Sequence, residues 1–238
     1  MLVPMKRSFS LLTVFYFAVV MPLQAAEKRL PLKGEVFLIQ ERTAFLILPE
    51  KPKTGNPIPW VWYAPTLRGL PSNSEKWMFE RFLKAGIAIA GVDVGESYGS
   101  PKGRAVYTAL HEYLIKKRGL AKEACLLGRS RGGLMLYCWA AENPEKVRCI
   151  TGIYPVCNIA SYPGLKRACG AYGLTAEQLE AELSKHNPID RLAPLAKAKV
   201  PIFHVHGDKD GAVPLDKNSA LIKERYDKLG GFMTLEIV

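Results

Sequence analysis

Short apolar stretches alternate with longer amphipathic stretches along most of the chain. The short stretches are bounded by turn residues and have the length of β-strands, whereas the longer ones carry the capping residues of helices. Strands are expected at residues 35–40, 43–48, 60–63, 87–92, 124–127, 148–153, 200–204 and 232–238. Helices are expected from the capping box at 72–75 to about 85, from the end of the loop 95–103 to about 118, and over 132–142, 176–184 and 215–229.

The order of these elements predicts an α/β fold. The first two strands are separated by one polar pair, which indicates an antiparallel hairpin, and strands and helices alternate after it. This pattern predicts a mainly parallel sheet with helices on both faces. We expect residues 27–238 to form one such domain, with a cap-like excursion over about 155–194. Loops that follow the strands gather at one edge of such a sheet, where ligands bind.

The first 26 residues have the pattern of a secretory signal peptide. Lys6 and Arg7 precede an uncharged apolar run at residues 9–21, and the small residues Ala25 and Ala26 follow it. The run is too short to span a bilayer comfortably. We therefore expect export to the periplasm or the extracellular space. The alternative is an uncleaved membrane anchor, the one case in which a membrane partner is expected.

The chain is basic, with a formal charge of +11, of which +9 remains after the signal peptide is removed. The simplest interpretation is a solvated basic surface, and the alternative is attraction to acidic substrates or anionic surfaces. Like charges do not form a block of five or six, and aromatic residues are not interleaved with a basic stripe. Nucleic acid is therefore not an expected partner.

Five cysteines cannot all pair with one another inside one chain. Cys125 lies in an apolar strand pattern and is most simply a small buried hydrophobic residue. Cys157 and Cys169 flank a loop-like stretch and are the expected pair. The cysteines and histidines lack the spacing of a metal site, and no cofactor is expected.

Residues 128–132 read Gly-Arg-Ser-Arg-Gly and lie between an expected strand and an expected helix. This setting is typical of a nucleophile elbow, in which a sharp turn holds a serine in a strained backbone conformation at the sheet edge. Glycines two residues to either side avoid a collision across the turn. Ser130 is therefore the candidate nucleophile. The alternative is a glycine-rich turn that serves packing alone.

A serine nucleophile needs a base and a carboxylate that orients the base. Residues 200–214, VPIFHVHGDKDGAVP, place acids just after an expected strand that ends in histidine. With the elbow, this segment resembles α/β-hydrolases, in particular dienelactone-hydrolase-like esterases and the catalytic domains of prolyl-oligopeptidase-type peptidases. The resemblance covers about residues 34–238. It implies that Asp210 is the triad acid, with Asp208 as second choice.

The same resemblance implies a histidine base after the last strand. The sequence reaches Val238 inside that expected strand, and none of His111, His186, His204 and His206 matches the family position. One explanation is a base that follows Val238 in a longer chain, which a strand without a polar end favours. The other explanation is a protein that lacks the base.

The negative charge that forms on the carbonyl oxygen needs two preorganised donors. The backbone N–H of Arg131, which follows the nucleophile, is the first expected donor. The second is the N–H of Thr66 or Leu67, in the loop after the third strand. Tyr98 and Tyr154 lie at strand ends, where they line the substrate pocket or pack in its wall.

Two arginines flank the serine. Partly buried arginines usually have partners, so Arg129 and Arg131 are expected to pair with acids such as Asp93 or Glu96. The sharper hypothesis is that one of them, with Arg129 as the candidate substrate-binding residue, holds a carboxylate or phosphate of the substrate.

Together these features predict an exported serine hydrolase. Ser130 would attack the carbonyl of a small ester or acyl substrate, the absent histidine would take its proton, Asp210 would orient that histidine, and water would hydrolyse the acyl-enzyme. One domain leaves no room for the propeller of oligopeptidases, which favours ester over peptide cleavage. The alternatives are a prolyl-oligopeptidase-like peptidase and a non-catalytic binding protein of the same fold.

Overall fold

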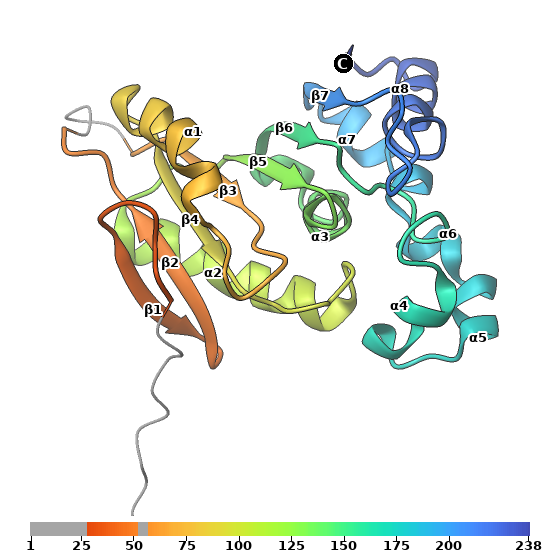
Figure 1. Ribbon diagram of the computed structural model, residues 1–238, viewed down its shortest axis with the longest axis horizontal. Coiled ribbons are helices and arrows are strands. Elements are labelled where there is room, and N and C mark those ends of the chain that lie inside the picture. The colour runs from red at the N-terminus through yellow and green to blue at the C-terminus, as the bar shows by residue number, and fades with distance from the viewer. Residues whose placement is uncertain (1–27, 52–56) are drawn as a thin grey trace, which may run out of the picture.

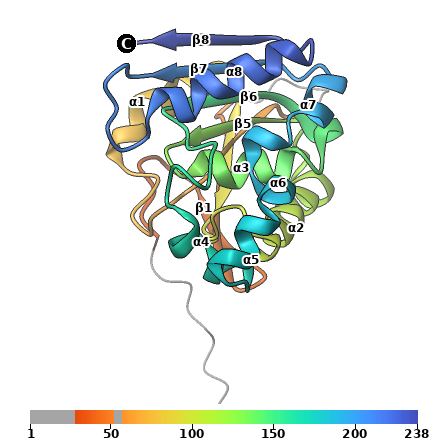
Figure 2. The same ribbon diagram turned by 90° about the vertical axis from the view of Figure 1, so that its right-hand side faces the viewer.

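The computed structural model describes residues 28–51 and 57–238. The predicted signal peptide, residues 1–26, lies outside the described residues. Eight strands form one sheet in the order β1-β2-β4-β3-β5-β6-β7-β8, with helices on both faces (Figure 1 and Figure 2). Within the described ranges, no helix is both long and apolar enough to cross a membrane.

The sheet confirms the predicted fold class. The hairpin β1–β2 is antiparallel, β2 also runs antiparallel to β4, and every later pair of neighbours is parallel. The eight predicted strands are all present, and their bounds differ from the predicted ones by two residues or fewer. The strands are β1 Glu35–Ile39, β2 Arg42–Ile47, β3 Trp60–Tyr63, β4 Ala88–Val92, β5 Ala124–Arg129, β6 Val147–Ile153, β7 Ile202–His206 and β8 Met233–Ile237.

The helices begin and end largely at the predicted signals. The capping box is present, because Ser72 N donates to the Glu75 carboxylate at 2.7 Å. The second helix begins at Pro101, inside the predicted loop, since proline fits the first turn of a helix. The helices are α1 Asn73–Lys84, α2 Pro101–Arg118, α3 Gly132–Ala140, α4 Leu165–Tyr172, α5 Ala176–Ala181, α6 Leu183–His186, α7 Ala193–Lys197 and α8 Ser219–Lys228.

The later helices differ from the prediction. The helix expected at 176–184 is divided at Glu182 into α5 and α6, and α4 and α7 were not predicted. The helix expected at 215–229 is a short 3₁₀ turn followed by α8, with a break at Asn218. The Asn218 side chain is buried there and accepts from the N–H groups of Cys157 at 2.9 Å and Asn158 at 3.2 Å. A tertiary contact therefore overrides the local helical preference.

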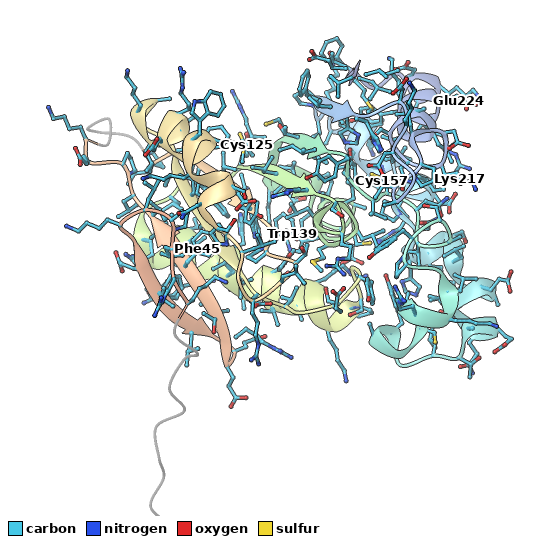
Figure 3. The ribbon with its side chains drawn as sticks, viewed as in Figure 1. Phe45, Cys125, Trp139, Cys157, Lys217 and Glu224 are labelled. Atoms are coloured by element: carbon cyan, nitrogen blue, oxygen red, sulfur yellow. The ribbon has the colours of Figure 1, made fainter. Side chains whose placement is uncertain are left out.

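Two apolar cores lie on opposite faces of the sheet. On the face covered by α2, α3 and α8, Trp62 packs against Trp139 of α3 with ring centroids 4.7 Å apart. On the other face, which we call the α1 face, Phe79 of α1 packs against Tyr63 with centroids 5.5 Å apart, beside Phe45. Figure 3 labels Phe45 and Trp139, one from each core. The sheet is thus a buried central layer that presents its carboxyl edge to the site.

The predicted disulfide between Cys157 and Cys169 is wrong, because all five cysteines carry free thiols. The buried Cys157 thiol lies 3.7 Å from the Pro155 carbonyl oxygen, whereas the Cys169 thiol lies 3.4 Å from that of Lys166. The two side chains face different neighbours although they are close along the chain. Cys125, expected to be buried, is half-buried.

Candidate active site

Ser130 lies at the turn between β5 and α3, as the elbow motif predicts. Its φ angle is +49°, in the left-handed region that non-glycine residues seldom adopt. Backbone hydrogen bonds hold this conformation: Ser130 N donates to Ile153 O at 3.1 Å, and Ser130 O accepts from Gly133 N at 3.0 Å and Val156 N at 2.8 Å. The strained turn is therefore over-determined by its surroundings, as a functional strain must be.

The glycines around Ser130 are required by close packing. A Cβ atom on Gly128 would lie 3.0 Å from Gly133 Cα, and one on Gly132 would lie 3.3 Å from the Ala64 carbonyl oxygen. A Cβ on Gly133 would lie only 2.5 Å from Val156 O, closer than real Cβ atoms approach. The steric explanation for the motif is confirmed, and Gly133 is a third required glycine that sequence reasoning missed.

Three of the candidate residues share the same unusual backbone conformation. Tyr98 follows β4 with a φ of +47°, Ser130 follows β5, and Tyr154 follows β6 with a φ of +37°. Tyr154 N also donates to Val205 O of β7 at 2.8 Å. Strained residues tend to cluster at functional sites. Their gathering at the carboxyl edge of one sheet supports the position predicted for the site.

Arg129 is paired, but with an acid that the sequence did not indicate. Its guanidinium donates to Glu75 Oε1 and to the Tyr154 hydroxyl, each at 2.5 Å. The expected partners, Asp93 and Glu96, were wrong for this residue. Glu75 is 2% exposed and also accepts from the Tyr63 hydroxyl at 3.2 Å. The arginine before Ser130 is thus fastened to a carboxylate in the first turn of α1.

The charge of Glu75 is stabilised although the residue is buried. Burial raises the pKa of its carboxyl, but hydrogen bonds from Ser72 and Arg129 outweigh that effect, so the pKa lies below its ordinary value. The bond from Ser72 N is 2.7 Å long. Glu75 therefore contacts both Arg129 of the elbow and the last residue of the loop 64–72, which carries the predicted oxyanion donors.

Arg131 pairs with Glu96, one of the two acids named from the sequence, at 2.7 Å. Its guanidinium also lies 3.5 Å from the hydroxyl of Tyr162, a residue of the excursion that sequence reasoning missed. Tyr98 is buried next to this pair, and burial together with Glu96 raises the pKa of its hydroxyl. Both arginines beside Ser130 are thus held by carboxylates, and the side chain of Arg129 is the more exposed.

The predicted oxyanion donors have unused N–H groups, and Thr66 lies beside the elbow. Gly132 packs on the loop after β3, since a Cβ there would lie 3.7 Å from Thr66 Cγ2. Thr66 is buried and Leu67 is exposed. In the part of the chain that the structure describes, the N–H groups of Arg131, Thr66 and Leu67 donate no hydrogen bond within the protein. They are therefore available to a carbonyl oxygen.

Asp210 lies in the loop after β7, at the same edge of the sheet as Ser130. Its Oδ1 accepts from the N–H groups of Ala212 and Val213, each at 2.9 Å, and Oδ2 lies 3.9 Å from His206 Nε2. The side chain is 22% exposed. Asp208, the second choice, is exposed. Two backbone N–H groups thus hold the Asp210 carboxylate in place.

A buried hydrogen-bonded row connects α3 to the Asp210 loop. The Tyr137 hydroxyl is 2.8 Å from His204 Nε2, and Ser219 Oγ lies 2.9 Å from His204 Nδ1. Ser219 Oγ is also 2.7 Å from His206 Nδ1, whose ring Nε2 lies 2.7 Å from Val213 O. We call these five residues the histidine row. Both histidines are fully buried.

The partners assign one tautomer to each histidine. His206 Nε2 must donate to the Val213 carbonyl, so its Nδ1 accepts the single proton of Ser219. Ser219 Oγ then accepts from His204 Nδ1, and His204 Nε2 accepts from the Tyr137 hydroxyl. Burial, and next the neighbouring His206, lower the pKa of His204 to about 3. Every member of the row has a hydrogen-bond partner in this arrangement.

The other two histidines contact groups outside the elbow. His111 Nε2 is 2.7 Å from Lys122 O, and His186 packs against Tyr172 with ring centroids 4.8 Å apart. Among the described residues, none of the four histidines hydrogen-bonds to Ser130. The same part of the chain contains no cluster of three His, Cys, Asp or Glu side chains that could hold a metal ion.

A hollow of about 600 Å³ lies at the opposite edge of the sheet. It is lined by residues at the amino ends of β5, β6 and β7, among them Glu123, Val147 and Pro201. Because ligands of open α/β sheets bind at the carboxyl ends of the strands, this hollow does not belong to the candidate site.

The sheet order, the elbow and the Asp210 loop define a serine-hydrolase-type α/β-hydrolase. The model of the prolyl oligopeptidase family, peptidase family S9, matches residues 107–228. The chain therefore belongs to the prolyl oligopeptidase family. The matched region contains the elbow and the Asp210 loop, which the sequence resemblance had singled out. A search of the curated proteins found no match.

Solved structures with the same fold include peptidases and an esterase. Porphyromonas gingivalis dipeptidyl peptidase 4 is 14% identical with a TM-score of 0.67, over 86% of this chain and 31% of that protein. Est1E from Butyrivibrio proteoclasticus is 18% identical with a TM-score of 0.62, over 86% and 88%. A carboxylesterase from Lactobacillus plantarum is 14% identical with a TM-score of 0.66, over 87% and 82%. The chain spans about a third of the peptidase.

Proposed function

We propose that this chain is the catalytic domain of an exported serine hydrolase that cleaves carboxylic esters. The observation that carries the proposal is the strained φ of +49° at Ser130, a half-buried residue in the turn that follows β5 at the carboxyl edge of the sheet. The unused N–H group of Arg131 follows it directly. Thr66 or Leu67 supplies the second oxyanion donor, and Asp210 orients the base.

The proposed reaction follows from these positions. Ser130 Oγ attacks the ester carbonyl while its proton passes to a general base, and the carbonyl oxygen becomes an oxyanion held by backbone N–H groups. The alcohol leaves with the proton from the base, so an acyl-enzyme remains. Water, deprotonated by the same base, then attacks the acyl group and releases the acid and Ser130.

We place the general base outside the described residues, in a segment that follows β8. Val238 O accepts from Asp208 N at 3.1 Å, so a continuation of the chain would start beside the Asp210 loop. We propose that a histidine there contacts the Asp210 carboxylate. The competing proposal is a non-catalytic binding protein, which the engagement of all four histidines with other groups favours.

Ester cleavage is proposed first because of the similarity to a carboxylesterase. The match to the Lactobacillus carboxylesterase extends over 87% of this chain and 82% of that protein. A prolyl-oligopeptidase-like peptidase is the second candidate. Membership of the prolyl oligopeptidase family favours this candidate.

We further propose that Arg129, Tyr98 and Tyr154 border the substrate. The Arg129 side chain is 36% exposed, so its guanidinium retains an open side although Glu75 and Tyr154 hold it. If it holds an anionic substrate group, Arg129→Lys raises KM for anionic esters and leaves KM for neutral esters unchanged. If Arg129→Lys leaves KM unchanged for anionic and neutral esters alike, Arg129 does not have this role.

A fluorophosphonate probe tests the nucleophile and the base together. Residues 1–238 and the product of the complete reading frame are labelled in parallel, each also as Ser130→Ala and as the control Ser74→Ala, an exposed serine on α1. The proposal expects labelling of the complete product and its Ser74→Ala variant, and none in Ser130→Ala. Absence of labelling in the complete product supports the binding protein.

Hydrolysis rates separate the two enzyme classes. A panel of short acyl and aryl esters is compared with aminoacyl and prolyl amides of the same leaving group. The esterase is supported if the ratio of kcat/KM for the esters to that for the amides exceeds the ratio of their uncatalysed hydrolysis rates. A preference for the amides supports the peptidase.

Export is tested by fractionation and N-terminal sequencing. A protein in the periplasm or medium that begins at residue 26 or 27 supports cleavage of the predicted signal peptide. A full-length protein in the membrane fraction supports the uncleaved anchor.

A further inference from the structure

Two cysteines lie side by side on neighbouring parallel strands. Cys125 of β5 and Cys149 of β6 are register partners in the sheet. Adjacent strands lie about 4.8 Å apart, and disulfides form between Cα atoms about 4.4–6.8 Å apart. Side chains at paired positions point to the same face of the sheet. The backbone therefore brings these two thiols within bonding reach.

Both thiols lie on the α1 face and are reachable from solvent. Cys125 packs against the apolar cluster of that face, which includes Phe79 of α1 and Leu127 of β5. Figure 3 labels Cys125 at β5, near α1. Both cysteines are only half-buried, whereas Cys138 and Cys157 are fully buried.

The two thiols also interact with each other. A hydrogen bond from the Cys149 thiol, aided by Arg148, lowers the pKa of Cys125 although burial opposes it. The same hydrogen bond is the main cause that raises the pKa of Cys149. By contrast, burial raises the pKa of Cys138 to about 11. Since the thiolate is the reactive form, Cys125 is the favoured point of attack.

We propose that Cys125 and Cys149 form a redox-active dithiol, which a small-molecule disulfide oxidises to a reversible disulfide between β5 and β6. The Cys125 thiolate attacks one sulfur of the oxidant and expels the first thiolate, which takes up a proton. The Cys149 thiolate then attacks the Cys125 sulfur of the mixed disulfide and expels the second. Two protein thiols are oxidised and one disulfide oxidant is reduced to two thiols.

The coupling between the thiols favours the second step. Once Cys125 is in the mixed disulfide, its sulfur carries no negative charge, so the hydrogen bond that raises the pKa of Cys149 is weaker. The bond would form five residues before Ser130 on β5 and five residues before Tyr154 on β6. The disulfide would therefore be a covalent link between β5 and β6 below the candidate site. Its formation does not depend on whether that site is catalytic.

The test uses the purified full chain and oxidised glutathione. The chain is reduced, freed of reductant, incubated with oxidised glutathione, denatured and alkylated with N-ethylmaleimide. We expect two of the five thiols to escape alkylation and the mass of two hydrogen atoms to be lost. Trypsin should release residues 123–129 joined to 149–166, and fragmentation of this pair at the Tyr154–Pro155 bond in tandem mass spectrometry should assign the disulfide to Cys149 rather than Cys157. Dithiothreitol should restore all five thiols.

Variants provide the controls. Cys125→Ser and Cys149→Ser should each lose the cross-link, and Cys149→Ser should instead retain one glutathione on Cys125. Cys169→Ser, which removes a half-buried thiol on α4, should still form the cross-link. Complete alkylation of both cysteines after oxidation, or a bond from Cys125 to Cys157, would overturn the proposal. The peptide map of the unsubstituted chain decides the question even where a variant fails to fold.

Discussion

The guanidinium of Arg129 donates to the carboxylate of Glu75 over 2.5 Å, and this ion pair joins the residue before Ser130 to the first turn of α1. Glu75 also accepts from Ser72 N at the end of the loop 64–72. One buried carboxylate therefore holds the nucleophile elbow and the loop of the predicted oxyanion donors together.

Replacing this carboxylate should destabilise the fold. Glu75→Ala leaves the Tyr63 hydroxyl and the half-buried Arg129 without their partner, and we expect a loss of about 2–4 kcal/mol in the free energy of unfolding. Urea denaturation measures the loss. Glu80→Ala, which removes an exposed carboxylate 3.9 Å from Lys76 on the same helix, should cost less than about 0.5 kcal/mol. Equal losses for the two variants would contradict this role of Glu75.

The strain at Ser130 should be measurable as stability. Ser130→Gly and Ser130→Ala both remove the hydroxyl, but only glycine adopts a φ of +49° without strain. We expect Ser130→Gly to be more stable than Ser130→Ala by about 1 kcal/mol. At Ser74, inside α1, the order should reverse, because alanine favours a helix over glycine by about 1 kcal/mol. Thermal unfolding of the four variants gives both differences, and the same order at both sites would contradict the prediction.

The close approach behind the elbow predicts a penalty for any side chain at Gly133. A Cβ atom there meets Val156 O at 2.5 Å and Pro155 Cβ at 2.8 Å, so Gly133→Ala must displace backbone. We expect a loss of about 1–3 kcal/mol in unfolding free energy. Gly170→Ala is the matched control, since a Cβ there meets no atom within 4 Å inside α4. It should be neutral or stabilising by up to about 1 kcal/mol, and a comparable loss there would refute the steric explanation.

Ser219 connects the two histidines of the histidine row. Ser219→Ala removes the acceptor of His204 Nδ1 and the donor to His206 Nδ1, both buried. Two unsatisfied groups should cost about 2–4 kcal/mol, measured by urea denaturation. Ser219→Cys, which keeps a weak donor and acceptor, should recover part of the loss. The row has no energetic role if the alanine variant is as stable as the unsubstituted protein.

The same row predicts how stability depends on pH. His204 has a pKa of about 3 in the folded protein, against about 6.5 in an unfolded chain. As the pH falls, the His204 side chain therefore takes up a proton in the unfolded state before it does so in the folded state. Its contribution to stability is complete above pH 6.5 and is lost as the pH falls toward 3. Over that window the unsubstituted protein should lose up to about 1.4 kcal/mol more per pH unit than His204→Gln. Carboxyl groups titrate in both proteins and cancel, so equal slopes would exclude a neutral buried His204.

Local features of this fold could be predicted from the sequence, and tertiary ones could not. The strand pattern, the capping box at Ser72 and the elbow glycines are set by neighbours along the chain. The Arg129–Glu75 pair joins residues 54 positions apart, and the contact from Arg131 to Tyr162 spans 31 positions. No local pattern encodes such pairs.

The later helices and the cysteines illustrate the same limit. The break at Asn218 exists because its side chain accepts from two N–H groups more than 55 residues away. A disulfide between Cys157 and Cys169 was expected because the two residues are close along the chain. Cys125 and Cys149 are instead brought together by the register of β5 and β6. Register becomes visible only when the strands are paired.

The four hydrogen bonds from Tyr137 to Val213 are all donated in the same direction along the row. They link α3, β7, α8 and the loop that holds Asp210. Helix α3, which starts just after Ser130, and the loop that holds Asp210 therefore cannot shift relative to each other without breaking a hydrogen bond. Because both rings are shielded from water, dissolved salt does not weaken this link. The separation of Ser130 and Asp210 is set by the protein interior, and ionic strength should leave it unchanged.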